Sequence, residues 1–284
     1  MQYFKIADLK LSVNGADYDV FKKRMQKYTV PPFENADISV NFINDNCIEC
    51  ELPKSFVSKA GRYYFENDEG CGFYDYIDEV NKTVTLMNTD NTWCNITYRF
   101  SDLSDLFGIK TDGAVGNVLG NLFQQSVLNF DGMVIHASTV KFNGKAVTFT
   151  APSGTGKSTH TGLWKKYYPE TVVINDDMPA IRFIDDKVYA YGTPWSGKTD
   201  INENDRAPLE AMVFIERSEE CSITELSPMD AFIRMMREIP IYPFKHQSDL
   251  MMSMMNKLFS KVPAYLLKCD ISKDAVDTVK DKLF

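Results

Sequence analysis

The chain has 284 residues, 44% of them hydrophobic and 25% charged, which is ordinary for a soluble globular protein. Its formal net charge of −8 argues against nucleic acid or anionic membranes as partners, because both require a surplus of lysine and arginine. Length alone predicts about two domains. The sequence shows neither a signal-peptide core nor an apolar run long enough to span a bilayer, so we expect a cytoplasmic protein.

The first hundred residues show mostly the period-two alternation of apolar and polar residues that is typical of β-strands. No residue pattern in this region indicates a particular chemistry. We therefore expect a β-rich N-terminal module over residues 1–105. Its predicted strands include residues 38–42, 62–66, 72–77, 83–87 and 94–100, and its one predicted helix is 18–28.

A Cys-x-x-Cys pair, Cys47 and Cys50, is the one metal-like or redox-like motif of this module. Zinc would need a second pair of ligands, and the three histidines all lie beyond residue 130. The segment 46–53 also alternates like a strand. The pattern therefore favours ordinary reduced cysteines.

The second predicted domain, residues 106–284, begins with a helix that ends before Asp131-Gly132. Two strands follow at 133–142 and 145–151, joined by Asn143-Gly144. An Asn-Gly pair between two alternating apolar runs predicts a tight hairpin. The hairpin makes these two strands antiparallel, whereas βαβ crossovers would give a parallel sheet.

The rest of this domain alternates between strands and helices, which predicts an α/β fold. Ser227 followed by Pro228 is the preferred order of residues at the start of a helix. The predicted strands are 171–175, two within 178–192 joined at Asp185-Asp186, 210–217, 221–226 and 265–271; the predicted helices are 228–239, one after Ser248, and 273–283.

A glycine-rich loop, Ala-Pro-Ser-Gly-Thr-Gly-Lys-Ser-Thr at 151–159, lies between an apolar strand and a helical pattern. Gly154 and Gly156 let the backbone point successive N–H groups at phosphate oxygens, and the helix N-terminus adds partial positive charge. Lys157 is expected at the β- and γ-phosphates and Ser158 at Mg²⁺. Ala151 replaces the first glycine of the usual pattern, which is tolerated where φ is negative. The residues expected to bind the nucleotide are Ser153, Gly154, Thr155, Gly156, Lys157, Ser158 and Thr159.

Two further features belong to the same predicted site. Asp176 and Asp177 follow the apolar run 172–174, and carboxylates at a strand end can hold Mg²⁺ or take a proton from a hydroxyl. The hairpin is expected to bring His136 back to the loop end of the sheet. His160, in the first turn of the helix after the loop, is a secondary candidate.

The His136 strand, the hairpin into Ser-Gly-Thr-Gly-Lys-Ser-Thr and the strand ending in Asp-Asp resemble the HPr kinase/phosphorylase family over about residues 130–220. They are also similar to the nucleotide half of phosphoenolpyruvate carboxykinases. The resemblance implies a mixed-sheet P-loop kinase core that uses ATP and Mg²⁺ to phosphorylate a hydroxyl. It also implies assembly into a homo-oligomer, which is common among such proteins.

Carried over position by position, the resemblance assigns a role to each candidate. Lys157 contacts the phosphates, Asp176 is the general base and His136 assists near the transferring phosphate. Ser158 and Asp177 hold the metal. On the acceptor side, within 191–210, Lys198 and Arg206 are expected to neutralise the charge of the transferring group.

Departures from the family patterns narrow the expected substrate. The glycine-rich segment that true HPr kinases carry after their aspartate pair is absent, and "GTPWSGK" occupies that region. The N-terminal module also lacks the substrate-binding half of a carboxykinase. We therefore expect a kinase for a small molecule such as a hydroxy-amino acid. Two alternatives stay open: a regulator that binds nucleotide without transferring phosphate, and a kinase for a serine of a small carrier protein.

Overall fold

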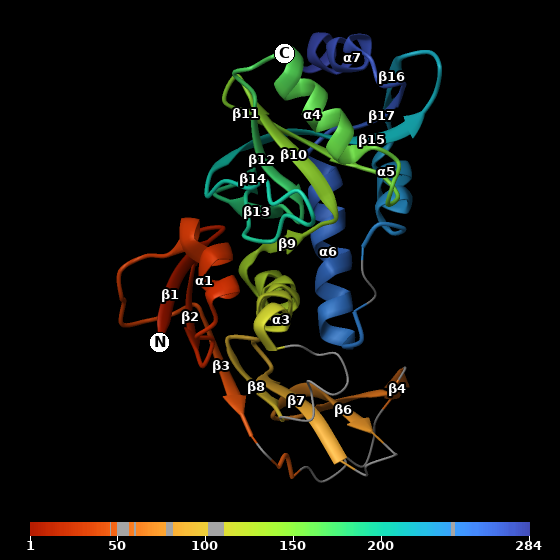
Figure 1. The fold of residues 1–284 in the computed structure, drawn as a ribbon. Helices are drawn as coiled ribbons and strands as arrows, with labels where there is room; N and C mark the ends of the chain where they lie inside the picture. The colour runs from red at the N-terminus through yellow and green to blue at the C-terminus, as the bar shows by residue number, and fades with distance from the viewer. Residues whose placement is uncertain (46, 50–56, 60, 78–81, 102–110, 240–241) are drawn as a thin grey trace. The chain divides into compact units, whose positions relative to one another are not determined.

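The computed structural model describes residues 1–284 except 46, 50–56, 60, 78–81, 102–110 and 240–241 (Figure 1). The chain forms two compact units. One holds Met1–Asn129 with Tyr242–Ser248, and the other holds Phe130–Ile241 with Asp249–Phe284. The predicted division of the chain into domains at 1–105 and 106–284 stays a prediction.

The first unit is built on a mixed sheet, which in the described part of the chain has eight strands in the order β1-β2-β3-β8-β7-β6-β5-β4. β2 and β8 run parallel to β3. The expected alternation is confirmed, since Ile38, Val40 and Phe42 of β3 are all buried. The strands are β1 (Gln2–Ile6), β2 (Leu9–Asn14), β3 (Ile38–Asn44), β4 (Val57–Lys59), β5 (Arg62–Asn67), β6 (Gly70–Ile77), β7 (Lys82–Asp90) and β8 (Asn95–Phe100).

Helices of the first unit are α1 (Asp19–Met25), which continues into a 3-10 turn at Gln26–Tyr28, and α3 (Thr111–Ser126). The predicted helix at 18–28 is thus confirmed. Cys50 lies outside the described residues, so the Cys-x-x-Cys pair is only partly described. The described cysteines, Cys47, Cys71, Cys94, Cys221 and Cys269, are free thiols.

The second unit contains a mixed sheet of nine strands in the described part of the chain. Its main path runs β12-β10-β11-β15-β14-β13-β9, and β17 adds to β15 with β16 beyond it. The strands are β9 (Gly132–Val134), β10 (Ala137–Phe142), β11 (Lys145–Thr150), β12 (Val172–Asp177), β13 (Ala180–Ile184), β14 (Lys187–Tyr191), β15 (Arg206–Arg217), β16 (Ser222–Leu226) and β17 (Ala264–Cys269).

The predicted hairpin at Asn143-Gly144 is confirmed. β10 and β11 pair antiparallel with Phe142 opposite Lys145, and both turn residues have positive φ, 48° and 77°. The strand predicted over 133–142 is instead two strands. β9 pairs with β13, whereas β10 pairs with β11 and β12, so the chain changes partner strands at Ile135–His136. His136 therefore lies in a break that the sequence pattern did not reveal.

Helices α4 (Lys157–Tyr167), α5 (Pro228–Met235), α6 (Lys245–Lys261) and α7 (Lys273–Leu283) complete this unit, α6 beginning within the segment assigned to the first. Ser227 caps α5 by accepting a hydrogen bond from the N–H of Asp230, as predicted, but the helix ends at Met235 rather than at 239. α6 begins at Lys245, before Ser248. Trp164 of α4 is fully buried against the sheet.

Strand direction brings five chain segments to one edge of this sheet. β11, β15 and β17 are parallel, and β12 has the same direction because both it and β11 are antiparallel to β10. The carboxyl ends of these four strands and the start of β10 therefore share an edge. Across that edge lie the Asp176–Asp177 pair, His136, the loop 151–156, Arg217 and Cys269–Asp270.

Candidate functional site

The loop after β11 has the backbone that its glycines were expected to provide. Gly154 and Gly156 have φ of 78° and 123°, and a Cβ at either position would have no neighbour within 4 Å. The left-handed region, rather than crowding, therefore explains these glycines. Ala151, which is buried, is not among the residues with positive φ, as predicted for its tolerance.

The loop leads directly into α4, whose N-terminus has no side-chain cap. Gly156 is the N-cap, no side chain caps the helix, and its first turn contains no acidic residue. Backbone N–H groups at such an end lack partners within the helix and carry the positive end of its dipole. The geometry suits a bound anion.

Lys157 is a buried cation at this helix start. Its side chain is 8% exposed, and Nζ donates a hydrogen bond of 2.7 Å to the carbonyl oxygen of Ala151. Burial lowers the pKa of Lys157, and the nearby carboxylates of Glu238, Asp177 and Asp176 act in the opposite direction. An anionic ligand would stabilise the charged form of this buried lysine, because it would supply a full negative charge beside the ammonium group. Glu238 was not identified from the sequence.

The two aspartates differ in their surroundings. Asp176 is 5% exposed, and its Oδ1 is buried without a hydrogen-bond partner. The Asp177 side chain is 33% exposed, and its Oδ1 lies 3.2 Å from Nε2 of His136. Pairing of β10 with β12 produces this contact, because Ala137 stands opposite Asp177.

Asn175 fixes the backbone of Asp177 and Met178 at the end of β12, a role that the sequence analysis did not identify. Its Oδ1 accepts from the N–H groups of Asp177 at 3.0 Å and Met178 at 2.7 Å. Its Nδ2 donates to the carbonyl oxygens of Thr193 at 2.9 Å and Trp195 at 3.2 Å. The fully buried side chain thus joins the end of β12 to the loop after β14.

That loop passes close over Asp177 at Gly197. Gly197 has φ of 62°, and a Cβ there would lie 2.9 Å from Oδ2 of Asp177. Only glycine can adopt this positive φ readily and also leave the Asp177 carboxylate in place, because it has no Cβ.

These groups line a cavity of about 420 Å³, which we call the lysine cavity. It brings together most of the residues predicted for the site. Those lining it are His136, Ser153, Gly154, Gly156, Lys157, Ser158, Thr159, Asp176, Asp177 and Lys198.

Arg206 does not line the lysine cavity, and the structure does not support its predicted role. Its Nη1 donates to Oη of Tyr191 at 2.8 Å, and its guanidinium lies 5.0 Å from the ring centroid of Tyr189. Its neighbour Asp205 accepts from Lys141, near the end of β10 that is remote from the cavity. Closeness in sequence to Lys198 was misleading, because residues 201–203 run along β12 away from its aspartate end and Arg206 then begins β15.

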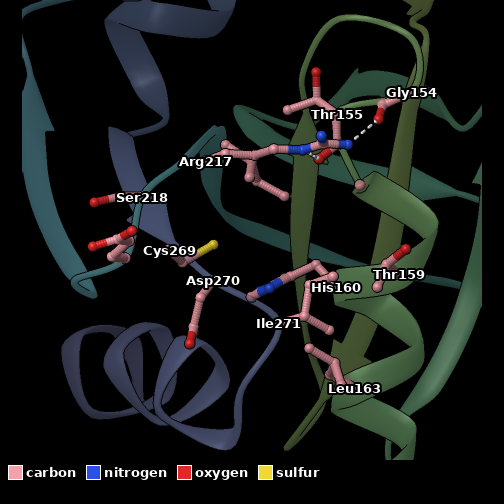
Figure 2. Close-up of a pocket in the computed structure, with 13 residues that line it drawn as sticks. Gly154, Thr155, Thr159, His160, Leu163, Arg217, Ser218, Cys269, Asp270 and Ile271 are labelled. Atoms are coloured by element: carbon pink, nitrogen blue, oxygen red, sulfur yellow. Dashed lines mark hydrogen bonds between the residues drawn. The ribbon is translucent and has the colours of Figure 1, made fainter.

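A second cavity, of about 560 Å³, borders the same loop on the side of β15 and β17 (Figure 2). We call it the arginine cavity, after Arg217 at the end of β15. Arg217 donates through Nη2 to the carbonyl of Gly154 at 2.5 Å and through Nε to that of Thr155 at 3.1 Å. These bonds attach the loop to the neighbouring strand, and no local sequence signal predicted them.

The wall of the arginine cavity also contains His160, whose tautomer follows from its contacts. The indole N–H of Trp164 donates to Nε2 of His160 at 3.2 Å, so Nδ1 carries the ring proton. His160 is 3% exposed, and its Nδ1 is buried without a partner. Burial lowers the pKa of His160 to about 4, and the ring is therefore neutral near pH 7.

Metal-binding groups are sparse in the described residues, where no cluster of three or more His, Cys, Asp or Glu side chains has metal-binding geometry. The lysine cavity nevertheless contains an all-oxygen donor set, namely the Ser158 hydroxyl and the carboxylates of Asp176 and Asp177. Mg²⁺ is usually bound by one or two carboxylates with phosphate oxygens and water completing its shell. The donors present therefore fit Mg²⁺ arriving with a phosphate ligand.

Comparison with known proteins gives a distant structural likeness. No family model matches the sequence, and no curated protein does so. Among solved structures, the HPr(Ser) kinase/phosphatase from Coxiella burnetii matches 53% of this chain and 95% of its own, at 12% identity and a TM-score of 0.31.

The chain is thus a mixed α/β protein with two mixed sheets in its described residues and a partial structural similarity to an HPr kinase. No described helix is both long enough and apolar enough to cross a membrane.

Proposed function

We propose that the protein is an ATP- and Mg²⁺-dependent kinase that transfers the γ-phosphoryl group to a hydroxyl of a small molecule. One observation supports this most: the anion-binding loop with its buried lysine shares a single cavity with two aspartates and a histidine. A cavity that only held an anion would not need carboxylates, which repel it. A phosphoryl-transfer site requires both.

The loop amides, the N-terminus of α4 and Lys157 bind the phosphates. Lys157 exchanges the carbonyl of Ala151 for phosphate oxygens, which are stronger partners because they are charged. Its burial keeps water away from this contact, so the electrostatic attraction is weakly screened.

Ser158 and Asp177 would hold the metal ion, which supplies a positive charge for the phosphate oxygens when bound. His136 contacts Asp177 and fixes the orientation of its carboxylate, as hydrogen-bonded partners of metal ligands commonly do. Asn175 and Gly197 set the position of the same carboxylate through the backbone.

Asp176 is the candidate base. Its Oδ1 is an acceptor without a donor, and a substrate hydroxyl would satisfy it. As the hydroxyl oxygen bonds to the γ-phosphorus, its proton passes to Asp176. The bond from the γ-phosphorus to the bridging oxygen breaks, and ADP leaves with that electron pair.

A small polar acceptor fits the exposed mouth of the lysine cavity. Gly197, Lys198 and Thr199 are exposed there, whereas the nearby large apolar side chain, Trp195, is 4% exposed. An acceptor protein would need a larger footprint, typically about 800 Å² per partner. Lys198 offers a charge partner for a carboxylate, which favours a hydroxy-amino acid or a similar metabolite.

ADP formation from ATP–Mg²⁺, measured with a panel of hydroxylated metabolites and small carrier proteins, tests the proposal. We expect one or more metabolites to stimulate ADP formation in the wild type and none to do so in Lys157→Ala. Phosphate transfer to a carrier-protein serine at comparable efficiency would assign the protein-kinase alternative. Tight ATP binding without turnover across the panel would assign the regulator alternative.

A further inference from the structure

A third cavity, of about 280 Å³, lies between α4, the end of β12 and the segment 199–201. We call it the α4 cavity. It shares Ser158, Asp176 and Thr199 with the lysine cavity, so ligands in the two cavities would border each other. The segment 199–201 is fixed beside β12, because the N–H of Asp176 donates to the carbonyl of Ile201 at 3.1 Å. The kinase proposal assigns no role to the rest of this cavity.

Asp176 is the group that the acceptor hydroxyl must reach, and it lines both cavities. Its side chain is buried, and its Oδ1 has no hydrogen-bond partner. An acceptor placed wholly in the lysine cavity would share that space with the triphosphate and the metal ion. An acceptor in the α4 cavity can approach the same carboxylate and leave the lysine cavity to the nucleotide. The α4 cavity is therefore the better place for the body of the acceptor.

Gly162 leaves the α4 cavity open on the side of the helix. Glycine inside a helix is unfavourable, because it loses more backbone freedom on folding than any other residue. Close packing does not explain this glycine, since a Cβ there would have no neighbour within 4 Å. Gly162 lines the α4 cavity instead, where a side chain would occupy the space of a ligand. Its position points to a ligand that lies close to the helix backbone.

Lys165 is the cation that the α4 cavity offers. A second lysine of the lining, Lys166, has its ammonium group 5.0 Å from the centre of the Tyr167 ring. Lys165 is exposed and forms no ion pair with another described residue. It lies on the same face of α4 as Ser158, about 10 Å further along the axis, and helical side chains lean towards the N-terminus. Its ammonium group can therefore meet an anion a few bonds away from a hydroxyl at Asp176.

The other side chains of the α4 cavity add no further charge. Val173 is buried and Ile201 is partly exposed, and both offer apolar contact to a short carbon chain. The hydroxyls of Thr161 and Thr199 already donate to backbone carbonyls. Among the described residues of the lining, Asp176 is the one acid, and the acceptor hydroxyl takes its free position. The cavity thus suits a small molecule with a hydroxyl at one end and an anionic group at the other.

Resting on the kinase proposal, we propose that the α4 cavity is the acceptor site and that the acceptor is a small hydroxylated metabolite with an acidic group. Its hydroxyl donates to Asp176, and its acid, a carboxylate or a phosphate, pairs with Lys165. An acid beside Lys198 would instead share the lysine cavity with the negative charges of the triphosphate. The hydroxyl oxygen bonds to the γ-phosphorus, its proton passes to Asp176, and the products are ADP and a phosphate ester.

Rates of ADP formation at saturating ATP–Mg²⁺ test this assignment. The hydroxylated metabolites of the panel above are supplied in pairs that differ in the acidic group, such as D-glycerate with glycerol and L-serine with serinol. Glycerol 3-phosphate distinguishes a phosphate from a carboxylate. We expect the preferred acid to have a kcat/KM about fivefold above that of its neutral partner, the upper end of what an exposed ion pair contributes. Neutral partners that are used as well as the acids would overturn the acidic acceptor.

Lys165→Met keeps the length of the side chain and removes its charge. The KM of the acid should rise about fivefold, while kcat, the KM of the neutral partner and ATP affinity stay unchanged. A lysine that only complemented the dipole at the end of α4 would change stability but not this preference. Lys165→Arg should keep the preference, as should the control Lys187→Met at an exposed position outside both cavities. A preference that persists in Lys165→Met would overturn the placement of the acid, and its loss in Lys198→Met would then assign the lysine cavity instead.

Gly162→Leu fills the α4 cavity with a residue that a helix accommodates better than glycine. The free energy of unfolding should therefore not fall, and ATP affinity measured by calorimetry should match that of the wild type. The kcat/KM of every acceptor should fall at least about tenfold, because the acceptor can no longer lie close to the helix. Full acceptor use by Gly162→Leu would overturn the α4 cavity as the acceptor site and leave the kinase proposal standing. No stimulation of ADP formation by any metabolite in the wild type would overturn both.

Discussion

The lysine cavity and the arginine cavity border the same loop, yet their charged side chains are held in different ways. On one side a buried lysine faces two aspartates and His136, which touches Asp177. On the other side His160 is neutral, Leu163 and Ile215 are apolar, and Arg217 is bonded to loop carbonyls, while the carboxylates of Glu219 and Asp270 complete the lining. Both cavities contain charged side chains, but only the lysine cavity has a buried cation beside two aspartates, the arrangement for which phosphoryl transfer is proposed.

The strand order of the sheet explains this difference. Antiparallel β10 places the start of one strand, with His136, between the ends of β11 and β12. On the other flank β11, β15 and β17 are all parallel, so only strand ends and their following turns reach the edge. Substitutions on the β12 side should therefore affect transfer, and those on the β17 side should affect nucleotide binding and stability.

The largest effect is expected from Asp176→Asn. The amide keeps the shape of the side chain but cannot accept the proton of the acceptor hydroxyl, so transfer should fall by roughly 10²–10⁴-fold while ATP affinity changes little. Steady-state ADP formation and calorimetry measure the two quantities. Asp185→Asn, at the turn between β13 and β14 where Asp185 has φ of 47°, is the matched control and should retain activity. Equal turnover in Asp176→Asn and wild type would remove Asp176 from the mechanism.

Lowering the pH should reduce the free energy of unfolding because His160 is buried in its neutral form. Its pKa is about 4 in the folded chain against 6.5 for the unperturbed group, so both states are neutral above pH 6.5. Between pH 6.5 and 4 the unfolded chain binds a proton that the folded chain does not, and about 3 kcal/mol of stability is lost by pH 4. His160→Gln should lack this loss in urea unfolding at pH 7.5 and 4. Parallel declines in both proteins would show that His160 is not held neutral.

Gly197→Ala tests whether the position of the Asp177 carboxylate requires a residue without a side chain at position 197. Gly144, at the hairpin turn, also has positive φ but no neighbour near its Cβ position, so Gly144→Ala is a matched control. Both variants should lose about 1 kcal/mol of unfolding free energy from the left-handed backbone. Only Gly197→Ala should also weaken the Mg²⁺-dependent part of ATP binding, measured by titration with and without Mg²⁺. Identical binding by the two variants would contradict a role for the Asp177 position.

Arg217→Ala should produce the smallest of these effects, because Arg217 is exposed and its bonds to the loop carbonyls are partly screened. We expect a several-fold loss of affinity for both ATP and tripolyphosphate, since the loop shape serves both cavities. Arg234, which pairs with Glu216 at 2.7 Å, provides the control Arg234→Ala. A loss confined to ATP would instead mean that Arg217 contacts the nucleoside alone.

Local signals in the sequence were sufficient for much of the second unit. The Asn143-Gly144 hairpin, the glycine loop, the helix after it and the aspartate strand end each depend on residues close together in the chain, and all are present. The Ser227 cap and the helix at 273–283 were predictable for the same reason. The end of α5 and the start of α6 were not, because neither carries a capping signal.

Features that depend on strand order could not be predicted. The break between β9 and β10 arises because two different strands, β13 and β12, pair with one continuous alternating run. The bonds of Arg217 and Asn175, and the closeness of Gly197 to Asp177, join segments that are far apart in the sequence. Arg206 lies away from the lysine cavity because it begins β15, whose other end, Arg217, reaches the cavity edge.

Binding of ATP–Mg²⁺ to Lys157→Ala and Lys166→Ala tests the central claim, that the loop is a working nucleotide site, most directly. Both lysines lie on α4, but only Lys157 is buried at the loop. At a ligand concentration of a hundred times Kd, wild type and Lys166→Ala should gain about 2.7 kcal/mol of stability from ATP–Mg²⁺ in thermal unfolding. Lys157→Ala should gain almost nothing. The same stabilisation in all three proteins, or in none of them, would contradict the assignment of this loop as a nucleotide site.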